Sequence, residues 1–185
     1  MAEPKRKRAT YEDVLKAPEH MVAEIVEGEL YLNPRPGKPH GKAEIRLGTL
    51  LDGPFGLGRD GPGGWVILAE PELHLKHDVL VPDLTGWRVE RAPLEGPEPY
   101  FTDAPDWLCE IVSPSTGRLD RIKKLPIYAN SGVQNAWLID PVQRSLEVYR
   151  NEGKRWTLIA THADQEEVRA EPFDAVALEL KLLWI

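Results

Sequence analysis

Cysteine is almost absent from this chain of 185 residues, which contains only Cys109. A single thiol excludes an internal disulfide and a zinc cluster built from several thiolates. Long apolar runs are absent too: no stretch approaches the roughly 20 apolar residues that cross a bilayer, and no apolar segment follows the basic N-terminal residues, as a secretory signal requires. We therefore expect a cytoplasmic protein without a membrane partner.

Positive charge is also scarce. Lys and Arg total 23 against 30 Asp and Glu, which gives a net charge of −7. Because proteins that bind duplex nucleic acid usually present a basic face, this balance argues against such a partner. The objection is partial, since basic residues cluster locally at 5–8 and 118–124. We interpret residues 1–9 as a mobile basic arm.

Two common catalytic motifs are missing. The chain has no Gly-x-Ser-x-Gly turn for a serine nucleophile. Its glycine-rich segment, 56–64, precedes an apolar strand instead of a helix, so it does not predict a phosphate-binding loop. With 42% hydrophobic residues the composition is that of a globular protein, and we expect one domain over 1–185.

Local patterns predict a mixture of helices and strands. Alternation and short apolar runs favour strands at 24–26, 29–32, 65–69, 70–76, 106–112, 135–140 and 145–150, with a further short strand that begins near Val81 or Asp83. The apolar run 65–69 should be buried on both faces. Helical spacing and capping residues favour helices at 10–17, 40–51 and 117–130, the second ending at Gly53-Pro54. Glu27-Gly28 has the composition of a tight turn, so the first two strands should form a hairpin.

The order of these elements predicts the architecture. From residue 106 a strand, a helix and a second strand follow one another, which indicates a right-handed crossover and a parallel strand pair. We therefore expect an α/β (α+β) fold, with a central mixed β-sheet flanked by helices and an N-terminal β-hairpin. The apolar tail, 172–185, should form a last strand or helix on the core or on a second subunit, and a homodimer is a hypothesis.

Glu110 is the residue that most needs a chemical explanation. It lies within the apolar segment 107–112, on the face opposite to Cys109, where an unpaired carboxylate would cost several kcal/mol. If Asp83 and Lys124 converge on Glu110, the three residues predict a site for phosphodiester hydrolysis. The acids would hold a divalent metal ion, Mg²⁺ or in its place Mn²⁺, and the ammonium would steady the attacking water.

Helical spacing decides between two adjacent lysines. Asp120, Lys124 and Tyr128 share one stripe of the predicted helix, whereas Lys123 lies about a quarter of a turn away. Lys124 should therefore face the sheet. Pro126 lacks the backbone N–H of a helix interior and should kink or end the helix nearby.

These residues carry a resemblance to a known family that covers most of the chain. The segments concerned are Thr10-Tyr11, Glu24-Ile25-Val26-Glu27-Gly28-Glu29, His40, Pro82-Asp83, Pro105-Asp106-Trp107, Glu110-Ile111-Val112-Ser113-Pro114-Ser115-Thr116, Asp120 with Lys124 and Tyr128, Gly132-Val133, Trp137-Leu138-Ile139-Asp140-Pro141 and Val148-Tyr149. In them the chain resembles the Uma-type restriction endonucleases of the PD-(D/E)xK nuclease superfamily. The passage from the strand through Ser-Pro-Ser-Thr to the spaced Asp, Lys and Tyr is the specific part.

The resemblance implies a restriction-endonuclease-like core, an Mg²⁺-dependent endonuclease activity on DNA, and Asp83 and Glu110 as metal ligands. In the wider superfamily the lysine stands two residues after the second acid, where this chain has Val112. The resemblance places the catalytic lysine at Lys124 in the following helix, from which a long side chain can re-enter the site. Glu24 and His40 match further family positions, as an additional ligand or as residues that orient a water.

Structural roles remain alternatives for each of these residues. Asp83 could cap a turn, Glu110 could form a purely structural ion pair with Lys124, and Lys124 could instead be solvated. Glu24 could be an exposed strand residue and His40 a capping or core histidine. The alternative functions are a catalytically silent nucleic-acid-binding or regulatory protein on a nuclease fold, and a nuclease for RNA or for damaged or branched DNA.

Overall fold

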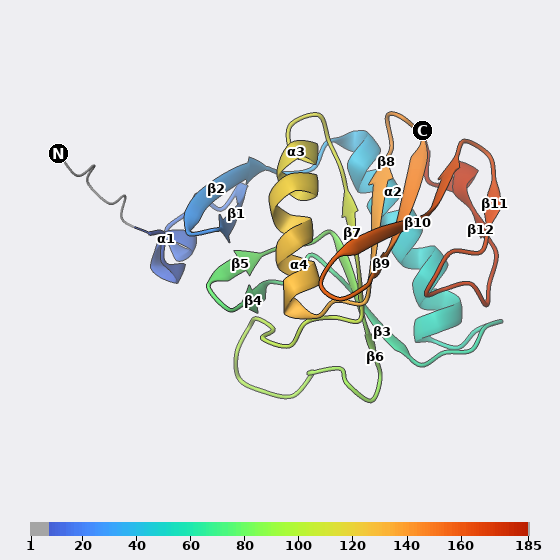
Figure 1. Cartoon of the computed structure of the whole chain (residues 1–185), viewed down its shortest axis with the longest axis horizontal. Coiled ribbons are helices and arrows are strands. Elements are labelled where there is room, and N and C mark those ends of the chain that lie inside the picture. Colours follow the sequence, from blue (N-terminus) through green and yellow to red (C-terminus); the bar gives the residue numbers. More distant parts are fainter. Residues whose placement is uncertain (1–7, 185) are drawn as a thin grey trace.

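A computed structural model describes residues 8–184 and has the mixed α+β fold expected from the sequence (Figure 1). Its centre is a six-stranded sheet with the strand order β10-β9-β8-β7-β6-β3. The strands are β3 (Trp65–Ala69), β6 (Leu84–Arg88), β7 (Trp107–Ile111), β8 (Asn135–Asp140), β9 (Ser145–Asn151) and β10 (Trp156–Ala163). β7 and β8 form the predicted parallel pair, and the other neighbouring strands are antiparallel.

A smaller sheet, in the order β2-β1-β5-β4, contains the N-terminal hairpin. Its strands are β1 (Met21–Val26), β2 (Glu29–Pro34), β4 (Leu73–Leu75) and β5 (Asp78–Leu80). Glu27 and Gly28 both have positive φ angles, 54° and 83°, as a two-residue hairpin turn requires, so the predicted hairpin is confirmed. Near the C-terminus β11 (Glu167–Val168) pairs with β12 (Leu178–Glu179), and the 3₁₀ helix η3 (Leu180–Leu182) follows.

Helices pack on both faces of the large sheet. α2 (Lys38–Leu51) continues into a π-helical turn, η1 (Asp52–Gly56), and packs on one face. On the other face α3 (Gly117–Leu119), the π-helical turn η2 (Asp120–Lys124) and α4 (Leu125–Ser131) follow without a break (Figure 1). The short α1 (Tyr11–Leu15) precedes the hairpin. Among the described residues no helix combines the length and apolar character needed to span a membrane.

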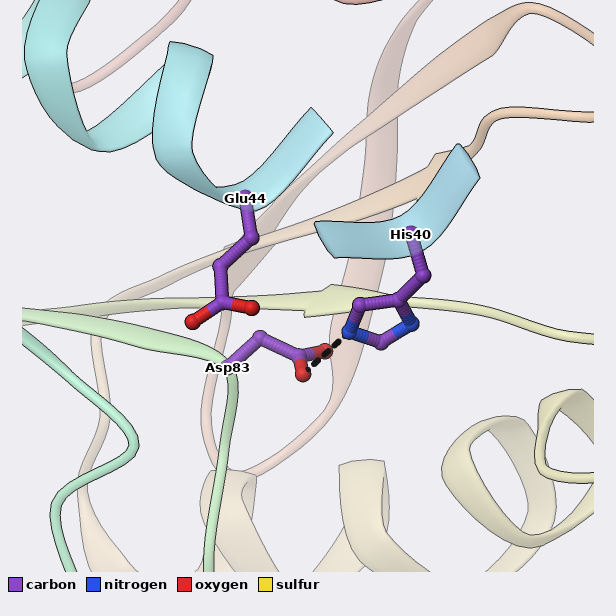
Figure 2. Close-up of side chains that lie close together, drawn as sticks. All are labelled: His40, Glu44 and Asp83. Atoms are coloured by element: carbon purple, nitrogen blue, oxygen red, sulfur yellow. Dashed lines mark hydrogen bonds and ion pairs between the residues drawn. The ribbon is translucent and has the colours of Figure 1, made fainter. Parts of the chain in front are cut away.

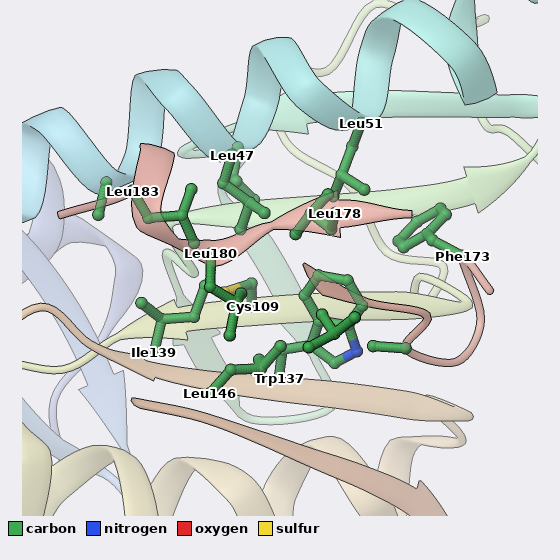
Figure 3. Packing of buried hydrophobic residues seen from close by; sticks show 14 of the residues in the cluster. Leu47, Leu51, Cys109, Trp137, Ile139, Leu146, Phe173, Leu178, Leu180 and Leu183 are labelled. Carbon is green, nitrogen blue, oxygen red and sulfur yellow. The ribbon is translucent and has the colours of Figure 1, made fainter. Parts of the chain in front are cut away.

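Strand β7 separates two hydrophobic cores because its side chains alternate between the faces of the sheet. Cys109 packs with Leu47 and Leu51 of α2 and with the C-terminal Leu180 (Figure 3). Leu108 belongs to the second core, on the side of α4. Glu110 shares the face of Leu108, so the predicted separation of Glu110 from Cys109 is confirmed.

The strand predictions need three corrections. The apolar run of β3 is only partly buried, because β3 is an edge strand whose one neighbour in the large sheet is β6. The segment 70–76 is extended only over Leu73–Leu75, and a turn at Lys76, with φ 61°, leads into β5, which was not predicted. β10 was not predicted either, because most of its residues are exposed or half-buried and give no clear alternation.

Both π-helical turns depart from the helix predictions. The α-helix α2 ends at Leu51 as predicted, but η1 continues the helical backbone through Gly53-Pro54, and Leu57 N–H bonds to Asp52 O at 2.8 Å. Pro126 does not end its helix. In η2 the N–H of Leu125 reaches back five residues to Asp120 O, and Pro126 then lies in the first turn of α4, where its missing N–H needs no partner.

Two further predictions concern the apolar C-terminal tail and the basic N-terminal arm. Phe173, Leu178 and Leu183 in the tail are buried in the core of their own chain, which is the first of the two positions predicted for the tail; the homodimer stays a hypothesis. Of the predicted basic arm, residues 1–7 lie outside the described residues. Its last residue, Ala9, donates its N–H to Gly28 O at 2.9 Å and is tied to the hairpin.

Candidate active site

A cavity of about 160 Å³ opens where the two sheets meet the N-terminal end of α2 and the turn η2. All five residues selected from the sequence line it: Glu24, His40, Asp83, Glu110 and Lys124. They come from segments far apart in the sequence, namely β1, α2, the residue before β6, β7 and η2. Folding therefore brings these residues to one place.

The sheet sets Asp83 beside Glu110. Leu84 pairs with Cys109 in the antiparallel ladder of β6 and β7, and Asp83 and Glu110 are the next residues outward along the two chains. The N–H of Ile111 donates to Asp83 Oδ2 at 2.6 Å, which fixes the carboxylate against the end of β7. Two oxygen-rich side chains thus face one cavity from adjacent strands.

Lys124 reaches into a group of buried carboxylates. Its Nζ lies 2.9 Å from Glu24 Oε1, 2.9 Å from Glu110 Oε1 and 3.6 Å from Asp120 Oδ1, and its side chain is 4% exposed. Lys123 does not line the cavity. Its Nζ donates to the Tyr31 hydroxyl and forms an ion pair with Glu27. The structure thus places Lys124 toward the sheet, as the spacing predicts.

Glu24 has a buried position in β1, not the exposed strand position that was its structural alternative. Its side chain is 3% exposed, and Oε1 accepts the N–H of Val81 at 2.9 Å in addition to its contact with Lys124. Oε2 accepts from Asn33 Nδ2 at 3.1 Å. These bonds hold Glu24 at one orientation between the small sheet and η2.

His40 meets Asp83 from the other side of the cavity. Its Nε2 lies 2.7 Å from Asp83 Oδ1, and the two side chains are 14% and 13% exposed. Glu44, one helical turn after His40, points at the same carboxylate (Figure 2). The potential ligand atoms of His40, Glu44 and Asp83 all lie within 4.8 Å of one another.

Burial and mutual repulsion raise the pKa of several of these acids. Burial, with Asp120, Asp83 and Glu24 as neighbours, raises the pKa of Glu110 well above its usual range, although Lys124 opposes the shift. Burial also raises the pKa of Asp120 to about 6. For Glu44, burial and then the charges of Asp83 and Glu70 raise the pKa to about 7.

The same surroundings favour the charged form of Lys124. Burial disfavours its charge, but the carboxylates of Glu110 and Glu24 outweigh burial and raise the pKa of Lys124 well above its usual range. Lys124 therefore stays an ammonium at neutral pH and can donate hydrogen bonds but cannot act as a base.

Sequence reasoning missed three residues of the site. Glu44 carried a usable signal, because it follows His40 by four residues on a predicted helix and so lies on the same face. Tyr128, recognised only as a stripe residue, donates its hydroxyl to Glu110 Oε1 at 2.7 Å. Glu70 lines the cavity from an irregular turn after β3, where no spacing rule applies.

The donor set fits a divalent cation. Among the described residues the cavity is lined by five carboxylates and by only two permanent cations, Arg35 and Lys124. Glu110 Oε1 accepts from both Lys124 and Tyr128, whereas no hydrogen bond from a described residue reaches Glu110 Oε2. A carboxylate oxygen that faces the cavity beside Asp83 is the kind of hard ligand that Mg²⁺ and Mn²⁺ prefer.

A comparison with protein families identifies the family of the chain. A family model described as "Uma2: Putative restriction endonuclease" matches residues 9–182. The chain belongs to the Uma2 family. The family predicted from the sequence is thereby confirmed, and Uma2 membership supports a nuclease, a hydrolase that acts on nucleic acids.

A solved structure shares the fold of this Uma2 chain. It is described as a putative nuclease belonging to DUF820 from Anabaena variabilis ATCC 29413, and it superposes with a TM-score of 0.77 over 95% of this chain and 97% of that chain. At 24% sequence identity, this likeness shows the fold and no more. No curated protein matches the chain.

Proposed function

We propose that the protein is a metal-dependent endonuclease that hydrolyses phosphodiester bonds in DNA. The observation that carries this proposal is the position of Lys124 among Glu24, Glu110 and Asp120 on the wall of a cavity that Asp83 also lines. A structural ion pair would need one acid for one lysine. The surplus of acids facing a cavity supports cation binding, and perturbed groups of this kind gather at functional sites.

Asp83 and Glu110 are the residues that would hold Mg²⁺ or Mn²⁺. Asp83 is oriented by His40 and by the N–H of Ile111, and Glu110 is oriented by Tyr128 and Lys124. Each acid therefore keeps one position through bonds to the protein, as metal ligands usually do. A divalent ion bound there would supply Lewis acidity toward a phosphate and lower the pKa of a water.

The protein's own residues would do the remaining work. In hydrolysis a water oxygen bonds to phosphorus, the bond from phosphorus to the leaving sugar oxygen breaks, and one proton leaves the water while another joins the leaving oxygen. The Lys124 ammonium would position the water and offset negative charge that develops on the phosphate. Glu24 would act through Lys124 as a positioning residue, because it holds Nζ at 2.9 Å.

The size of the cavity supports a phosphate as the group that enters it. A volume of about 160 Å³ is below the range of roughly 300 to 1,000 Å³ that is typical for small-molecule pockets. Arg35 lines the mouth with a side chain that is 58% exposed, and an arginine there suits a neighbouring backbone phosphate.

DNA is the substrate that we propose because the matched family is one of restriction endonucleases. The direct test is incubation of the full chain with supercoiled DNA, linear DNA and RNA, each with Mg²⁺, Mn²⁺ or EDTA. The proposal expects nicking or linearisation of DNA with a metal ion and none with EDTA, together with loss of cleavage in Glu110→Gln. The exposed acid Glu90 offers a matched control, Glu90→Gln, which should cleave like the wild type.

The rival function is that of a catalytically silent binding or regulatory protein. The net charge of −7 and the acidic cavity favour it, because both repel the phosphates of a nucleic acid. If the wild type cleaves no nucleic acid and calorimetry detects no divalent-cation binding, the acids are structural and this rival replaces the nuclease. Cleavage confined to RNA would keep the catalytic site and correct the substrate.

A further inference from the structure

We propose that strand β2 is an interface at which a second copy of this chain binds, with the two β2 strands paired antiparallel about Leu32. Each copy contributes its four-stranded small sheet, so the pairing joins two sheets into one. The hairpin that contains β2 lies at one end of the molecule, where a second copy has access to it (Figure 1). The interface is distinct from the candidate active site, and its formation does not depend on the proposed nuclease activity.

Strand β2 is a regular edge of the small sheet. Among the strands that the structure describes, its only pairing partner is β1, and the register between them is continuous over all 6 residues of β2. β10, which forms an edge of the large sheet, has instead an irregular register between Leu158 and Ala160. Bulges of this kind protect an edge strand from pairing with another chain. β2 has no such bulge.

The hairpin register determines which backbone groups of β2 point outward. Glu27 and Gly28 form a two-residue turn, so Glu29, directly after the turn, exchanges its backbone hydrogen bonds with β1. Because the bonding direction alternates along a strand, the N–H and C=O groups of Leu30 and Leu32 point away from β1. The side chains of Leu30 and Leu32 are 37% and 42% exposed. The outer edge therefore offers backbone donors and acceptors beside two exposed apolar side chains.

The sequence of β2 is self-complementary when two copies run antiparallel about Leu32. The outward N–H and C=O groups of the two Leu32 residues then bond to each other. Leu30 of each copy lies opposite Pro34 of the other, so the apolar side chains share one face and the Leu30 N–H reaches the Pro34 C=O. Glu29 lies opposite Arg35, which places unlike charges together at both ends of the pairing. A two-fold axis makes each contact occur twice, and a second copy is therefore the partner that this edge fits.

The pairing sets the two cavities on the same side of the joined sheet. Glu24 of β1 and Asn33 of β2 line the cavity from one face of the small sheet, opposite to Leu30 and Leu32. A two-fold axis perpendicular to a sheet keeps corresponding faces on the same side. If the protein is the nuclease proposed above, the dimer presents two active sites to one duplex, as cleavage of both strands by one complex requires.

Sedimentation equilibrium of the full chain, without DNA or added metal, tests the interface. We expect a dimer for the wild type. Leu32→Asp places two carboxylates opposite each other at the axis and should raise the dissociation constant at least about tenfold. Leu158→Asp, the matched control, changes a side chain on the β10 edge that is 51% exposed and should dimerise like the wild type. Circular dichroism confirms that both variants are folded. A monomeric wild type, or a Leu32→Asp that dimerises as tightly as Leu158→Asp, would overturn the proposal.

Cysteine cross-linking tests the register. The native Cys109 is buried, so Leu32→Cys supplies an accessible thiol. Residues opposite each other in the proposed pairing have Cα atoms about 5.5 Å apart, and oxidation should therefore link two Leu32→Cys chains. In Leu30→Cys the two thiols lie about 13 Å apart along the strands and should stay unlinked. Absence of the link in Leu32→Cys, or an equal link in Leu30→Cys, refutes the pairing. Neither experiment involves cleavage, so their failure is distinguishable from a failure of the proposed function.

Discussion

Lys123 and Lys124 are adjacent in the sequence and have opposite surroundings. Lys124 is 4% exposed and touches three carboxylates, while Lys123 is 31% exposed and pairs with Glu27 at the surface. The helical stripe of Asp120, Lys124 and Tyr128 predicts which lysine faces the sheet, so this part of the site could be deduced from spacing alone. The pair also provides an internal control for any experiment on the catalytic lysine.

Asp120 should make the metal-free protein less stable as the pH rises. Burial raises its pKa from 3.8 to about 6, so between these values the folded chain binds more protons than the unfolded chain and the free energy of unfolding falls with increasing pH. The contribution that is present below pH 4 is lost as the pH passes 6. The shift corresponds to at most about 3 kcal/mol.

Urea unfolding in EDTA between pH 4 and pH 7 tests this prediction. Relative to Asp120→Asn, the wild type should lose about 1 to 3 kcal/mol of unfolding free energy across that range. Asp174→Asn, which changes an exposed aspartate, should follow the wild type. A constant difference between the wild type and Asp120→Asn at all pH values would contradict the raised pKa.

Residues outside the regular elements mark the limit of sequence reasoning about the site. Glu110 was found because a carboxylate within an apolar strand is unusual, and Asp83 was found through the Pro82-Asp83 pair that the family resemblance includes. Glu70 was not found, since it lies in an irregular turn and reaches the cavity only through the tertiary fold. Neither strand alternation nor helical spacing predicts the tertiary position of such a residue.

The segment between β2 and α2 forms the rim of the cavity and carries Arg35. Pro34, Pro36 and Gly37 line the cavity beside it, and the two prolines restrict the backbone that presents the arginine. If the cavity receives a scissile phosphate, Arg35 is placed to bind a phosphate outside it. A basic residue at the rim also compensates in part for the negative charge of the whole chain.

Arg35→Gln should therefore weaken DNA binding more than it slows the chemical step. We expect a loss of affinity of roughly three- to tenfold and a salt dependence reduced by about one phosphate contact, with a single-turnover cleavage rate close to that of the wild type. Arg46→Gln, on the exposed outer side of α2, is the matched control and should change neither. Fluorescence anisotropy at several salt concentrations measures the affinity for DNA and its salt dependence. Equal affinities for the two variants would remove Arg35 from the binding surface.

Helices and strands were predicted correctly where the sequence pattern was complete. The predictions failed where neighbouring strands or helices determine the structure. β7, β8 and the parallel crossover follow from apolar runs separated by a helical stripe. The edge position of β3 depends on which strand pairs with it, and the half-exposed β10 has no clear alternation. The π-helical turns are not encoded by residue type alone, and η2 accommodates the Pro126 that was expected to disturb the helix.

The molecule as a whole depends on its C-terminal segment. Phe173 packs against Phe55, Trp65, Trp107 and Trp137, with ring centroids 4.8 to 5.6 Å apart. The tail thus closes the core between α2 and the large sheet. This packing accounts for the apolar character of Phe173, Leu178 and Leu183 within one chain.

Phe173→Ala should destabilise the protein by about 3 to 5 kcal/mol, because it leaves a cavity among four aromatic rings. Urea unfolding at fixed pH gives the difference. Leu94→Ala, at a side chain that is 62% exposed, is the control and should cost less than about 0.5 kcal/mol. A loss below about 1 kcal/mol for Phe173→Ala would mean that the tail is only loosely attached to the core.

The most direct test of the central claim is the single-turnover rate of DNA cleavage in Mg²⁺ for Lys124→Gln and Lys123→Gln, with circular dichroism to confirm that both are folded. The account predicts a rate at least about 100-fold below the wild type for Lys124→Gln and a rate within about twofold of it for Lys123→Gln. A folded Lys124→Gln that cleaves at the wild-type rate would contradict the catalytic role of the buried lysine and of the carboxylates that surround it.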